Sequence, residues 1–349
     1  MESLVEQHAA AGIHGPGSPE LARLEADVAR FLERDYRRQT DCPSRAPIVT
    51  DTGPILAEAA SLMARHYDAD LSLFAAFLDP HYMAYSMGWY GDGPEAIRAS
   101  NASLHQAQKA KLALAVERSG IVGDQHILDL GCGFGCLETF LAETRPGVKV
   151  TALTASRTQA DYIEACRRDP NHPLSSLDLR LIRADFGTIS EEELGVSAYD
   201  GFVSIAVFEQ AHNLRAAFSK IARLLRPGGR AFLHFITSRV TIPRLLDADR
   251  SLTARYFPGG RVWPYQIITQ HTAPLELESS WFISGLNYWR TLEAWHQAFW
   301  LNLSSMYPGA LDVEGVQHWN QYFSLCKACF TPMNGDTVGV GHFLLRKPA

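Results

Sequence analysis

Three features that are scarce or missing in this 349-residue chain each exclude a class of protein. The formal net charge is −6, so no basic surplus is available to neutralise a phosphate backbone, and nucleic acid is not expected as a partner. No apolar run approaches the length of a membrane span, so we expect no integral membrane segment. The amino-terminal residues lack the basic start and apolar core of a signal peptide, which predicts a cytoplasmic location.

Cysteine is also scarce, with six residues in the chain. Cys326 and Cys329 form a C-x-x-C pair, for which a metal or redox role is one interpretation. No second pair follows at zinc spacing, and the neighbouring residues are mostly apolar. We therefore favour buried free thiols and expect no bound metal.

The stretch Ile127-Leu-Asp-Leu-Gly-Cys-Gly-Phe-Gly135 is the most informative part of the chain. It predicts a short buried strand, a glycine-rich turn and a helix from about Cys136. Gly131, Gly133 and Gly135 remove the side chains at alternate positions of the turn. A ligand can then approach the backbone N–H groups and the amino terminus of the helix.

Two other glycine-rich loops fit this stretch poorly. The dinucleotide fingerprint G-x-G-x-x-G needs a third glycine where the chain has Cys136. The phosphate-binding loop needs G-K-[ST], which is absent. What is present is Asp-x-Gly-x-Gly-x-Gly, although the motif alone leaves an ordinary tight turn between strand and helix open.

Strand and helix patterns alternate from Gln125 onward. Strands are predicted at 126–130, 148–153, 179–183, 200–206 and 230–236, and helices at 136–144, 156–168 and 213–225. A turn is predicted at 226–229, before the fifth strand. This order predicts an α/β fold with a parallel sheet covered on both faces, whose ligand lies at the carboxyl ends of the strands.

The flanking segments divide the chain into further regions. We expect an N-terminal tail and helical segment over 1–53, with a helix at 20–38, and a helical region over 54–122 that covers the cofactor. The core spans 123–239, a helical cap spans 240–330, and 331–349 contributes a closing strand. Within 54–122 we expect helices at 55–67 and 103–120. Six of the seven Trp residues lie in the cap, which suits a lipophilic pocket as well as packing.

Several short segments follow one another in a characteristic order along the chain: Leu78-Asp-Pro, Tyr85-Ser86, Ala107-Gln108, Lys111-Leu112, the glycine turn, Leu153 to Gln159, Phe208-Glu209, Leu225 to Gly229, Phe257 to Gly260, Thr291 to Trp295 and Tyr322. In this order and spacing they resemble the cyclopropane-fatty-acid synthases and mycolic acid cyclopropane synthases, with the coclaurine-type N-methyltransferases as relatives. The resemblance implies a Rossmann-like class I methyltransferase sheet with an antiparallel last strand. It also implies S-adenosyl-L-methionine (AdoMet) as cofactor and S-adenosyl-L-homocysteine as product.

The resemblance implies particular roles in cofactor binding. Thr154 and Gln159 would replace the usual ribose-binding acid, although Gln159 also suits a capping box with Ser156. Asp185 would accept from the adenine amino group with Phe186 on the ring; the alternative for Asp185 is a surface turn.

The other end of the cofactor involves a second group of residues. Tyr85 and Ser86 resemble the family pair that closes over the methionine carboxylate. Asp129 would order the glycine turn or hold the cofactor ammonium through water, and Ile205 would line the adenosine site.

The acceptor side departs from the family pattern. Cyclopropane synthases are thought to hold bicarbonate with a Cys, a Glu, a His and a Tyr. The matching positions here are Met87, Glu209, Gln210 and Tyr322. Because Met and neutral Gln cannot replace a thiol and a titrating imidazole, bicarbonate binding is doubtful. Glu209 would act as a base or cation stabiliser, or else satisfy backbone donors at a strand end.

Two histidines are further candidates. His234 in the fifth strand could reach the site, and a satisfied core histidine is the alternative. His212 could replace the missing histidine, but a loop position without a role is favoured.

Three functions follow from these observations. The first is methyl transfer from AdoMet to carbon or nitrogen of a hydrophobic small-molecule or lipid-like acceptor, without ring closure. The second is cyclopropane formation on an unsaturated acyl chain, and the third is an inactive AdoMet-binding regulatory subunit. The sequence leaves a homodimer open.

Overall fold

The computed structural model describes residues 14–42, 48–56, 70–246 and 259–349. The strands are β1 (His126–Leu130), β2 (Lys149–Thr154), β3 (Asp178–Arg183), β4 (Tyr199–Ile205), β5 (Leu225–Ser238), β6 (Trp263–Pro264), β7 (Glu276–Ile283) and β8 (Val338–Arg346). The sheet order is β3-β2-β1-β4-β5-β8-β7, with β6 beside β5. β1 to β5 are parallel neighbours and β8 runs antiparallel to β5, which confirms the predicted sheet.

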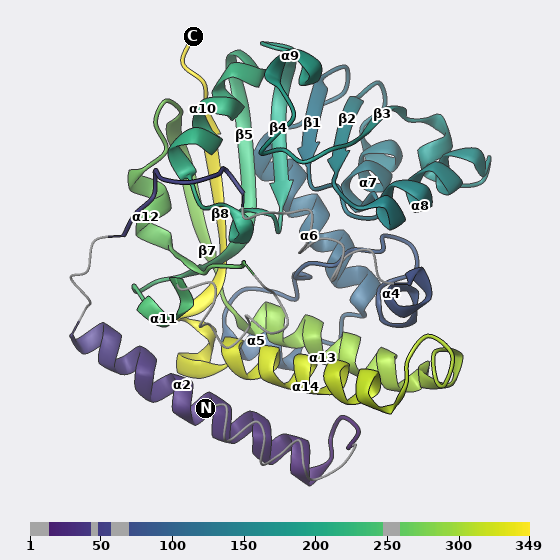
Figure 1. Cartoon of the computed structure of the whole chain (residues 1–349), viewed down its shortest axis with the longest axis vertical. Coiled ribbons are helices and arrows are strands. Elements are labelled where there is room, and N and C mark those ends of the chain that lie inside the picture. The colour runs from purple at the N-terminus through teal and green to yellow at the C-terminus, as the bar shows by residue number, and fades with distance from the viewer. Residues whose placement is uncertain (1–13, 43–47, 57–69, 247–258) are drawn as a thin grey trace.

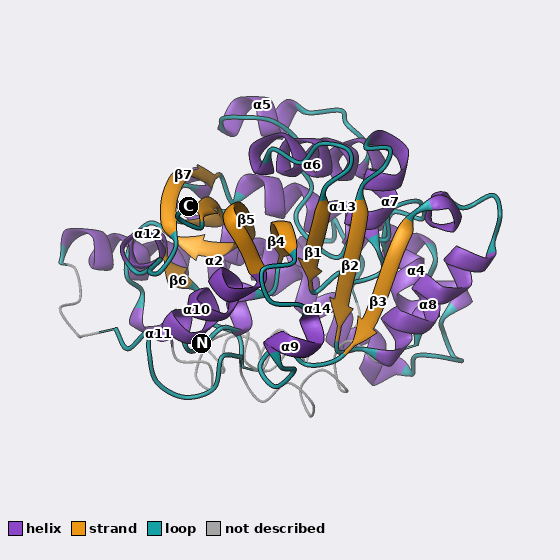
Figure 2. Cartoon of the chain, turned by 90° about the horizontal axis from the view of Figure 1, so that it is seen from above, coloured by secondary structure: helices purple, strands orange, loops and turns teal. Residues whose placement is uncertain are grey.

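Helices lie on both faces of the sheet and across the carboxyl ends of its parallel strands (Figures 1 and 2). They are α2 (Pro19–Asp41), α4 (Leu71–Phe77), α5 (Pro94–Ala99), α6 (Leu104–Ser119), α7 (Cys136–Thr144), α8 (Arg157–Arg168), α9 (Glu191–Leu194), α10 (Leu214–Leu224), α11 (Pro243–Leu246), α12 (Tyr265–Gln270), α13 (Leu286–Leu301) and α14 (Val313–Phe330). Short 3₁₀ turns are η1 (Pro173–Ser176), η2 (Phe208–Gln210), η3 (Leu303–Ser305) and η4 (Pro332–Gly335).

Strand side chains alternate between two cores because successive residues point to opposite faces. In β5, Leu233 and Phe235 pack with α9, α10 and α12, whereas Phe232 packs with α6, α7 and α8. The predicted ends of α6 are confirmed: Ser103 and Gln106 form the capping box, and Gly120 caps the other end at φ +72°.

A third core joins the N-terminal helix to the helical cap. Leu21, Leu24, Val28, Leu32 and Tyr36 form the buried face of α2, which packs with α4, α13 and α14. Lys327 on α14 pairs with Glu25 of α2 at 2.7 Å and with Glu293 of α13 at 2.8 Å. Both apolar contacts and charge therefore attach the N-terminal helix to the cap, and Figure 1 shows α2 running alongside α14.

The predicted turn at 226–229 is wrong, because these residues belong to β5. Gly228 N donates to Lys347 O at 3.0 Å, and Lys347 N donates to Gly229 O at 2.9 Å. Lys347, the residue after β8, thus supplies backbone hydrogen-bond partners that a local sequence pattern cannot reveal. A register shift between Tyr199 and Gly201 in the pairing of β4 with β5 accommodates the longer β5 strand.

The expected helical cap over 240–330 also contains β6 and β7. β7 is antiparallel to β8, so it extends the sheet as an edge strand. Most of the helix predicted at 55–67 lies outside the described residues, but Leu56 forms an isolated bridge with Ala211. None of the helices within the described ranges has the length and apolar character needed to cross a bilayer.

Candidate functional site

The glycine turn connects β1 to α7 and lies against the end of β2. The N–H groups of Gly131 and Cys132 donate to Leu153 O at 2.8 and 3.1 Å. Gly131 has φ +78°, and a Cβ there would lie 2.2 Å from Val207 Cγ2. The first residue of the turn must therefore be glycine for both conformational and steric reasons.

A cavity of about 940 Å³, which we call the glycine-turn cavity, opens at the carboxyl ends of β1 to β4. The predicted cofactor residues that line it are Tyr85, Ser86, Asp129, Gly131, Gly133, Thr154, Gln159, Asp185, Phe186 and Ile205. Gly135 does not line it; that residue caps the amino end of α7, at φ +82°. Four adjoining strand ends with the segments that follow them, together with the loop that carries Tyr85 and Ser86, thus bring ten of the eleven predicted residues to one space.

Side-chain acceptors follow the wall formed by β2 and β3. Thr154 Oγ1 donates to Gln159 Oε1 at 2.6 Å, while Gln159 N donates to Ser156 Oγ at 3.2 Å. The Gln159 backbone therefore takes part in the cap, and its side chain joins the cavity wall. Asp185 Oδ1 accepts from Gly187 N at 2.6 Å, so Asp185 both orders its turn and lines the cavity.

Two buried carboxyl groups lie at the end of β1. Burial raises the pKa of Asp129 to about 7, although Glu138 and Lys111 act in the opposite direction. Burial and then the charge of Asp129 raise the pKa of Glu138 well above its usual range. The two side chains share a hydrogen bond, in which a protonated carboxyl group donates to the other. Asp129 also lines the glycine-turn cavity, so this pair places an acidic group at the cavity wall.

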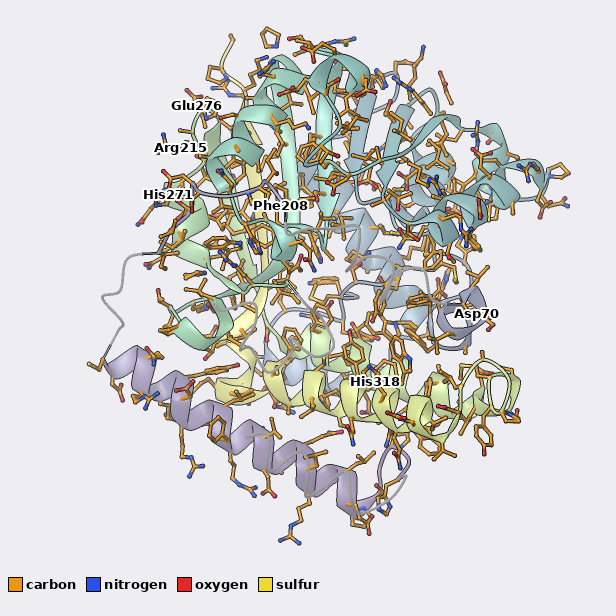
Figure 3. The ribbon with its side chains drawn as sticks, in the orientation of Figure 1. Asp70, Phe208, Arg215, His271, Glu276 and His318 are labelled. Atoms are coloured by element: carbon orange, nitrogen blue, oxygen red, sulfur yellow. The ribbon has the colours of Figure 1, made fainter. Side chains whose placement is uncertain are left out.

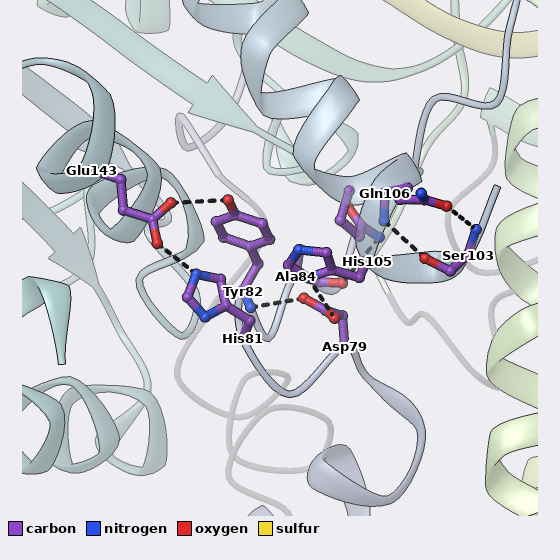
Figure 4. A network of polar contacts seen from close by, with 9 residues as sticks. Asp79, His81, Tyr82, Ala84, Ser103, His105, Gln106 and Glu143 are labelled. Atoms are coloured by element: carbon purple, nitrogen blue, oxygen red, sulfur yellow. Dashed lines mark hydrogen bonds and ion pairs between the residues drawn. The ribbon is translucent and has the colours of Figure 1, made fainter. Parts of the chain in front are cut away.

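The loop that carries Tyr85 and Ser86 is attached to α6 and α7 (Figure 4). His81 and Tyr82 contact the Glu143 carboxylate at 2.6 and 3.0 Å. At the start of the loop, Asp79 Oδ2 accepts from Tyr82 N at 2.8 Å, and Asp79 Oδ1 contacts His105 Nδ1 at 3.2 Å. These contacts hold the loop over the glycine-turn cavity.

A second cavity of about 930 Å³ lies between the sheet and the cap; we call it the tyrosine cavity. Its aromatic and polar lining includes Tyr36, Tyr85, Glu209, Arg261, Tyr288 and Tyr322, with the thiols of Cys326 and Cys329. Tyr85 Oη donates to Tyr322 Oη at 3.0 Å. Both cysteines are free, as predicted, and burial raises the pKa of Cys329 to about 12.

Glu209 is 3% exposed and belongs to η2, directly after β4. Phe208, labelled in Figure 3, precedes Glu209 in this turn. Its ring packs against the rings of Phe218 and Phe235. Glu209 Oε1 accepts from Ile236 N at 2.9 Å, whereas Oε2 has no hydrogen-bond partner among the residues that the structure describes. Burial raises the pKa of Glu209 to about 7 against the lowering effect of the Ile236 contact. One oxygen satisfies the backbone, and the other is a buried acceptor of a residue that lines the tyrosine cavity.

The remaining candidates lie elsewhere. Gln210 lines the glycine-turn cavity rather than the tyrosine cavity, and His234 lines neither. His234 Nδ1 contacts His342 Nε2 at 2.7 Å, and burial lowers the pKa of His234 well below its usual range. His212 Nε2 contacts Gly259 O at 3.0 Å. Met87 is fully buried among Ile283, Val340 and neighbouring aromatic residues.

The two cavities meet at Tyr85 and Ala206, which line both of them. Ala206 has φ +60°, an uncommon conformation for a residue with a Cβ. Sequence reasoning missed Ala206, Tyr36, Arg261 and Tyr288. A signal existed for Tyr36, because it continues the apolar face of the helix predicted at 20–38. No group of three or more His, Cys, Asp or Glu residues in the described ranges could hold a metal ion.

Comparison with known proteins connects this arrangement to one family. A family model for mycolic acid cyclopropane synthetase matches residues 56–339. The cyclopropane-fatty-acyl-phospholipid synthase of Escherichia coli is 28% identical over 280 residues, covering 74% of this chain and 66% of that synthase. The (S)-coclaurine N-methyltransferase of Thalictrum flavum is 25% identical over 264 residues, covering 72% of this chain and 71% of that enzyme.

Solved structures agree with the observed fold. Coclaurine N-methyltransferase, bound to N-methylheliamine and S-adenosyl-L-homocysteine, aligns over 99% of both chains with a TM-score of 0.80 and 22% identity. The cyclopropane synthase MmaA2 from Mycobacterium tuberculosis aligns over 84% of this chain and 100% of its own, with a TM-score of 0.67 and 24% identity. The predicted fold is thereby confirmed. The chain belongs to the mycolic acid cyclopropane synthetase family, whose relatives found here are AdoMet-dependent methyltransferases.

Proposed function

We propose that this protein transfers a methyl group from AdoMet to a carbon or nitrogen atom of a hydrophobic acceptor, without ring closure. The observation that carries the proposal is the junction at Tyr85 and Ala206, where the glycine-turn cavity meets the tyrosine cavity. A cofactor in the first cavity and an acceptor in the second would place two reacting atoms on either side of it. Such placement supplies a large part of the rate of a group transfer.

The glycine-turn cavity has the chemistry that AdoMet requires. Asp129 at the cavity wall suits the ammonium group, and Thr154 with Gln159 offers polar atoms to the ribose. Asp185 and Phe186 line the part of the wall where an adenine ring would lie. When bound, AdoMet supplies an electrophilic methyl group on a sulfonium centre.

The residues around the tyrosine cavity would orient the acceptor and exclude water. Glu209 Oε2 is buried in the wall of this cavity, where an ionised carboxylate stabilises a positive charge more strongly than it would in water. The pKa of Glu209 is raised to about 7, so near neutral pH the same oxygen can also accept a proton from an acceptor amine. The faces of Tyr85, Tyr288 and Tyr322 suit an apolar or cationic group.

Cyclopropane formation is the second candidate, favoured by the same Glu209 oxygen. It requires removal of a proton from the transferred carbon, and Glu209 would have to act as the base. The position that matches the family cysteine is Met87, which packs in an apolar cluster, and Gln210 lies on the other cavity. Simple methyl transfer therefore needs fewer groups than ring closure and is the function we propose.

The test uses AdoMet with a fully deuterated methyl group. The purified protein is incubated with unsaturated phospholipid in one reaction and with hydrophobic amines and cell extracts in others, and product masses are read. We expect a product that keeps all three deuterium atoms. A product that has lost one deuterium would contradict the proposal and establish ring closure instead.

Glu209→Gln provides the matched variant, because it preserves size and removes the titrating group. We expect at least a roughly 100-fold loss of turnover with unchanged S-adenosyl-L-homocysteine affinity. Full turnover by this variant would show that Glu209 has no catalytic role. A homodimer and a cytoplasmic location stay predictions from the sequence.

A further inference from the structure

A lysine lies fully buried behind the glycine-turn cavity. Lys111 on α6 is 0% exposed, and its Nζ donates to Ser86 Oγ at 3.0 Å. Burial lowers the pKa of Lys111, while the nearby Cys136 and Asp129 raise it. An ammonium group is seldom buried without a role, because its removal from water is costly.

The hydrogen bond to Ser86 has a fixed direction. A lysine ammonium can only donate, so Ser86 Oγ must accept. The hydroxyl proton of Ser86 must then point away from Lys111. Ser86 is 4% exposed and lines the glycine-turn cavity, so its proton is available to a ligand there. A donor polarised by a neighbouring cation favours an anionic acceptor.

The opposite charge lies close by on β1. Asp129 lines the same cavity and interacts electrostatically with Lys111. A cation behind Ser86 and a carboxyl group at Asp129 together match a zwitterion, with its carboxylate toward Ser86 and its ammonium toward Asp129. The amino-acid end of AdoMet is such a zwitterion.

We propose that Lys111 is a positioning residue that makes Ser86 a donor to the α-carboxylate of the cofactor and so selects for cofactors that carry this group. The proposal rests on AdoMet being the cofactor. Lys111 acts through Ser86 and does not touch the reacting atoms.

A purely structural role is the alternative, because α6 also holds this loop by uncharged contacts. Gln108 Nε2 donates to Ser86 O at 2.8 Å, three residues before Lys111 on the same helix face. If Lys111 only supported the loop, its loss would lower the binding affinity of every ligand of the cavity by the same factor. Selective loss of ligands with a carboxylate distinguishes the two roles.

The experiment compares two nucleosides by calorimetry. S-adenosyl-L-homocysteine carries the carboxylate, and S-adenosyl-3-thiopropylamine is the same molecule without it. For Lys111→Met we expect about 10- to 100-fold weaker binding of the first, the size of a lost charge-assisted hydrogen bond. Binding of the second should change by less than about threefold. Ser86→Ala should show the same selectivity, and it serves if Lys111→Met does not fold.

Lys220→Met is the matched control. Lys220 is also buried, but its Nζ donates to the carbonyl of Phe186 at 2.6 Å, on the wall assigned to adenine. Both nucleosides contain adenine, so this variant should change their affinities in parallel. An equal change of both affinities in Lys111→Met and Ser86→Ala, or no change, would overturn the role of Lys111. If the unsubstituted protein binds neither nucleoside, the cofactor proposal itself fails.

Discussion

The glycine-turn cavity and the tyrosine cavity are similar in size but assembled differently. The first is built by the ends of four adjoining parallel strands, each followed by a short turn. The second combines α2, η2, α13 and α14, which are widely separated in the chain. A cavity made from local strand ends follows from short motifs, whereas a cavity made from distant helices depends on tertiary packing.

The largest expected effect concerns the local cavity. Gly131→Ala would place a Cβ against Val207 at φ +78°, combining left-handed strain with overpacking. We expect the free energy of unfolding to fall by about 2–5 kcal/mol. Gly133 has φ +58°, but a Cβ added there would meet no atom within 4 Å. Gly133→Ala should therefore lower the free energy of unfolding by only about 1–2 kcal/mol. Urea unfolding measures both; equal losses would show that Val207 moves aside.

The next effect concerns the acid of the tyrosine cavity. The folded-state pKa of Glu209 is raised to about 7, above that of the unfolded chain. Its contribution to stability is therefore present at low pH and lost as the pH rises through about 7. Between pH 4.5 and 7 the free energy of unfolding of the unsubstituted protein should fall by about 3 kcal/mol relative to that of Glu209→Gln, as measured by urea unfolding at each pH. Asp129 titrates in both proteins, so its effect cancels in the difference between them. Parallel curves of unfolding free energy against pH for the two proteins would contradict this prediction.

A smaller effect should separate the two cavities. Lys327→Met removes the cation between Glu25 and Glu293 and loosens α2, which contributes Tyr36 to the tyrosine cavity. The Glu25 and Glu293 side chains are both about a quarter exposed (23%). We therefore expect the free energy of unfolding to fall by about 2 kcal/mol, which is less than the full cost of an unpaired buried charge. Lys327→Arg is the control that keeps the charge. Affinity for S-adenosyl-L-homocysteine, measured by calorimetry, should stay within about twofold; a parallel loss would mean that the cavities are not independent.

The smallest effect tests the junction. Tyr322→Phe removes the acceptor of the Tyr85 hydroxyl and should cost about 1 kcal/mol of stability without altering affinity for S-adenosyl-L-homocysteine. Tyr85→Phe changes a residue that lines both cavities, and should weaken that affinity about fivefold. Calorimetry with each variant provides the measurement. Identical affinities would place Tyr85 with the tyrosine cavity alone.

Most of the core sheet could be predicted because buried parallel strands and amphipathic helices leave strong local patterns. The end of β1 and the start of α7 agree with the prediction, since the glycine turn between them marks both. β7 was missed because an edge strand half-covered by the cap lacks a clear alternation, and its partner β8 lies far along the chain. The start of β5 was missed because Lys347 supplies its hydrogen bonds.

The candidate site shows the same contrast. The positions of Thr154, Asp185 and Ile205 followed from strand ends, which all meet at one edge of the sheet. Tyr36 and Tyr288 could not be assigned to a cavity, because only the packing of α2 against the cap helices α13 and α14 brings them to the cavity that Glu209 also lines. The Trp residues that suggested a lipophilic pocket do not line the tyrosine cavity; Trp295 and Trp319, for example, fill the core of the cap.

The attachment of α2 to α14 has a consequence for how the protein is made. α2 precedes the sheet in the chain, and α14 follows seven of its eight strands. Contacts of such large sequence separation form late, because a long loop must close before they bring any stabilisation. During synthesis the glycine-turn cavity can therefore form while α2 still has no partner. The emerging chain should bind cofactor before it can enclose an acceptor.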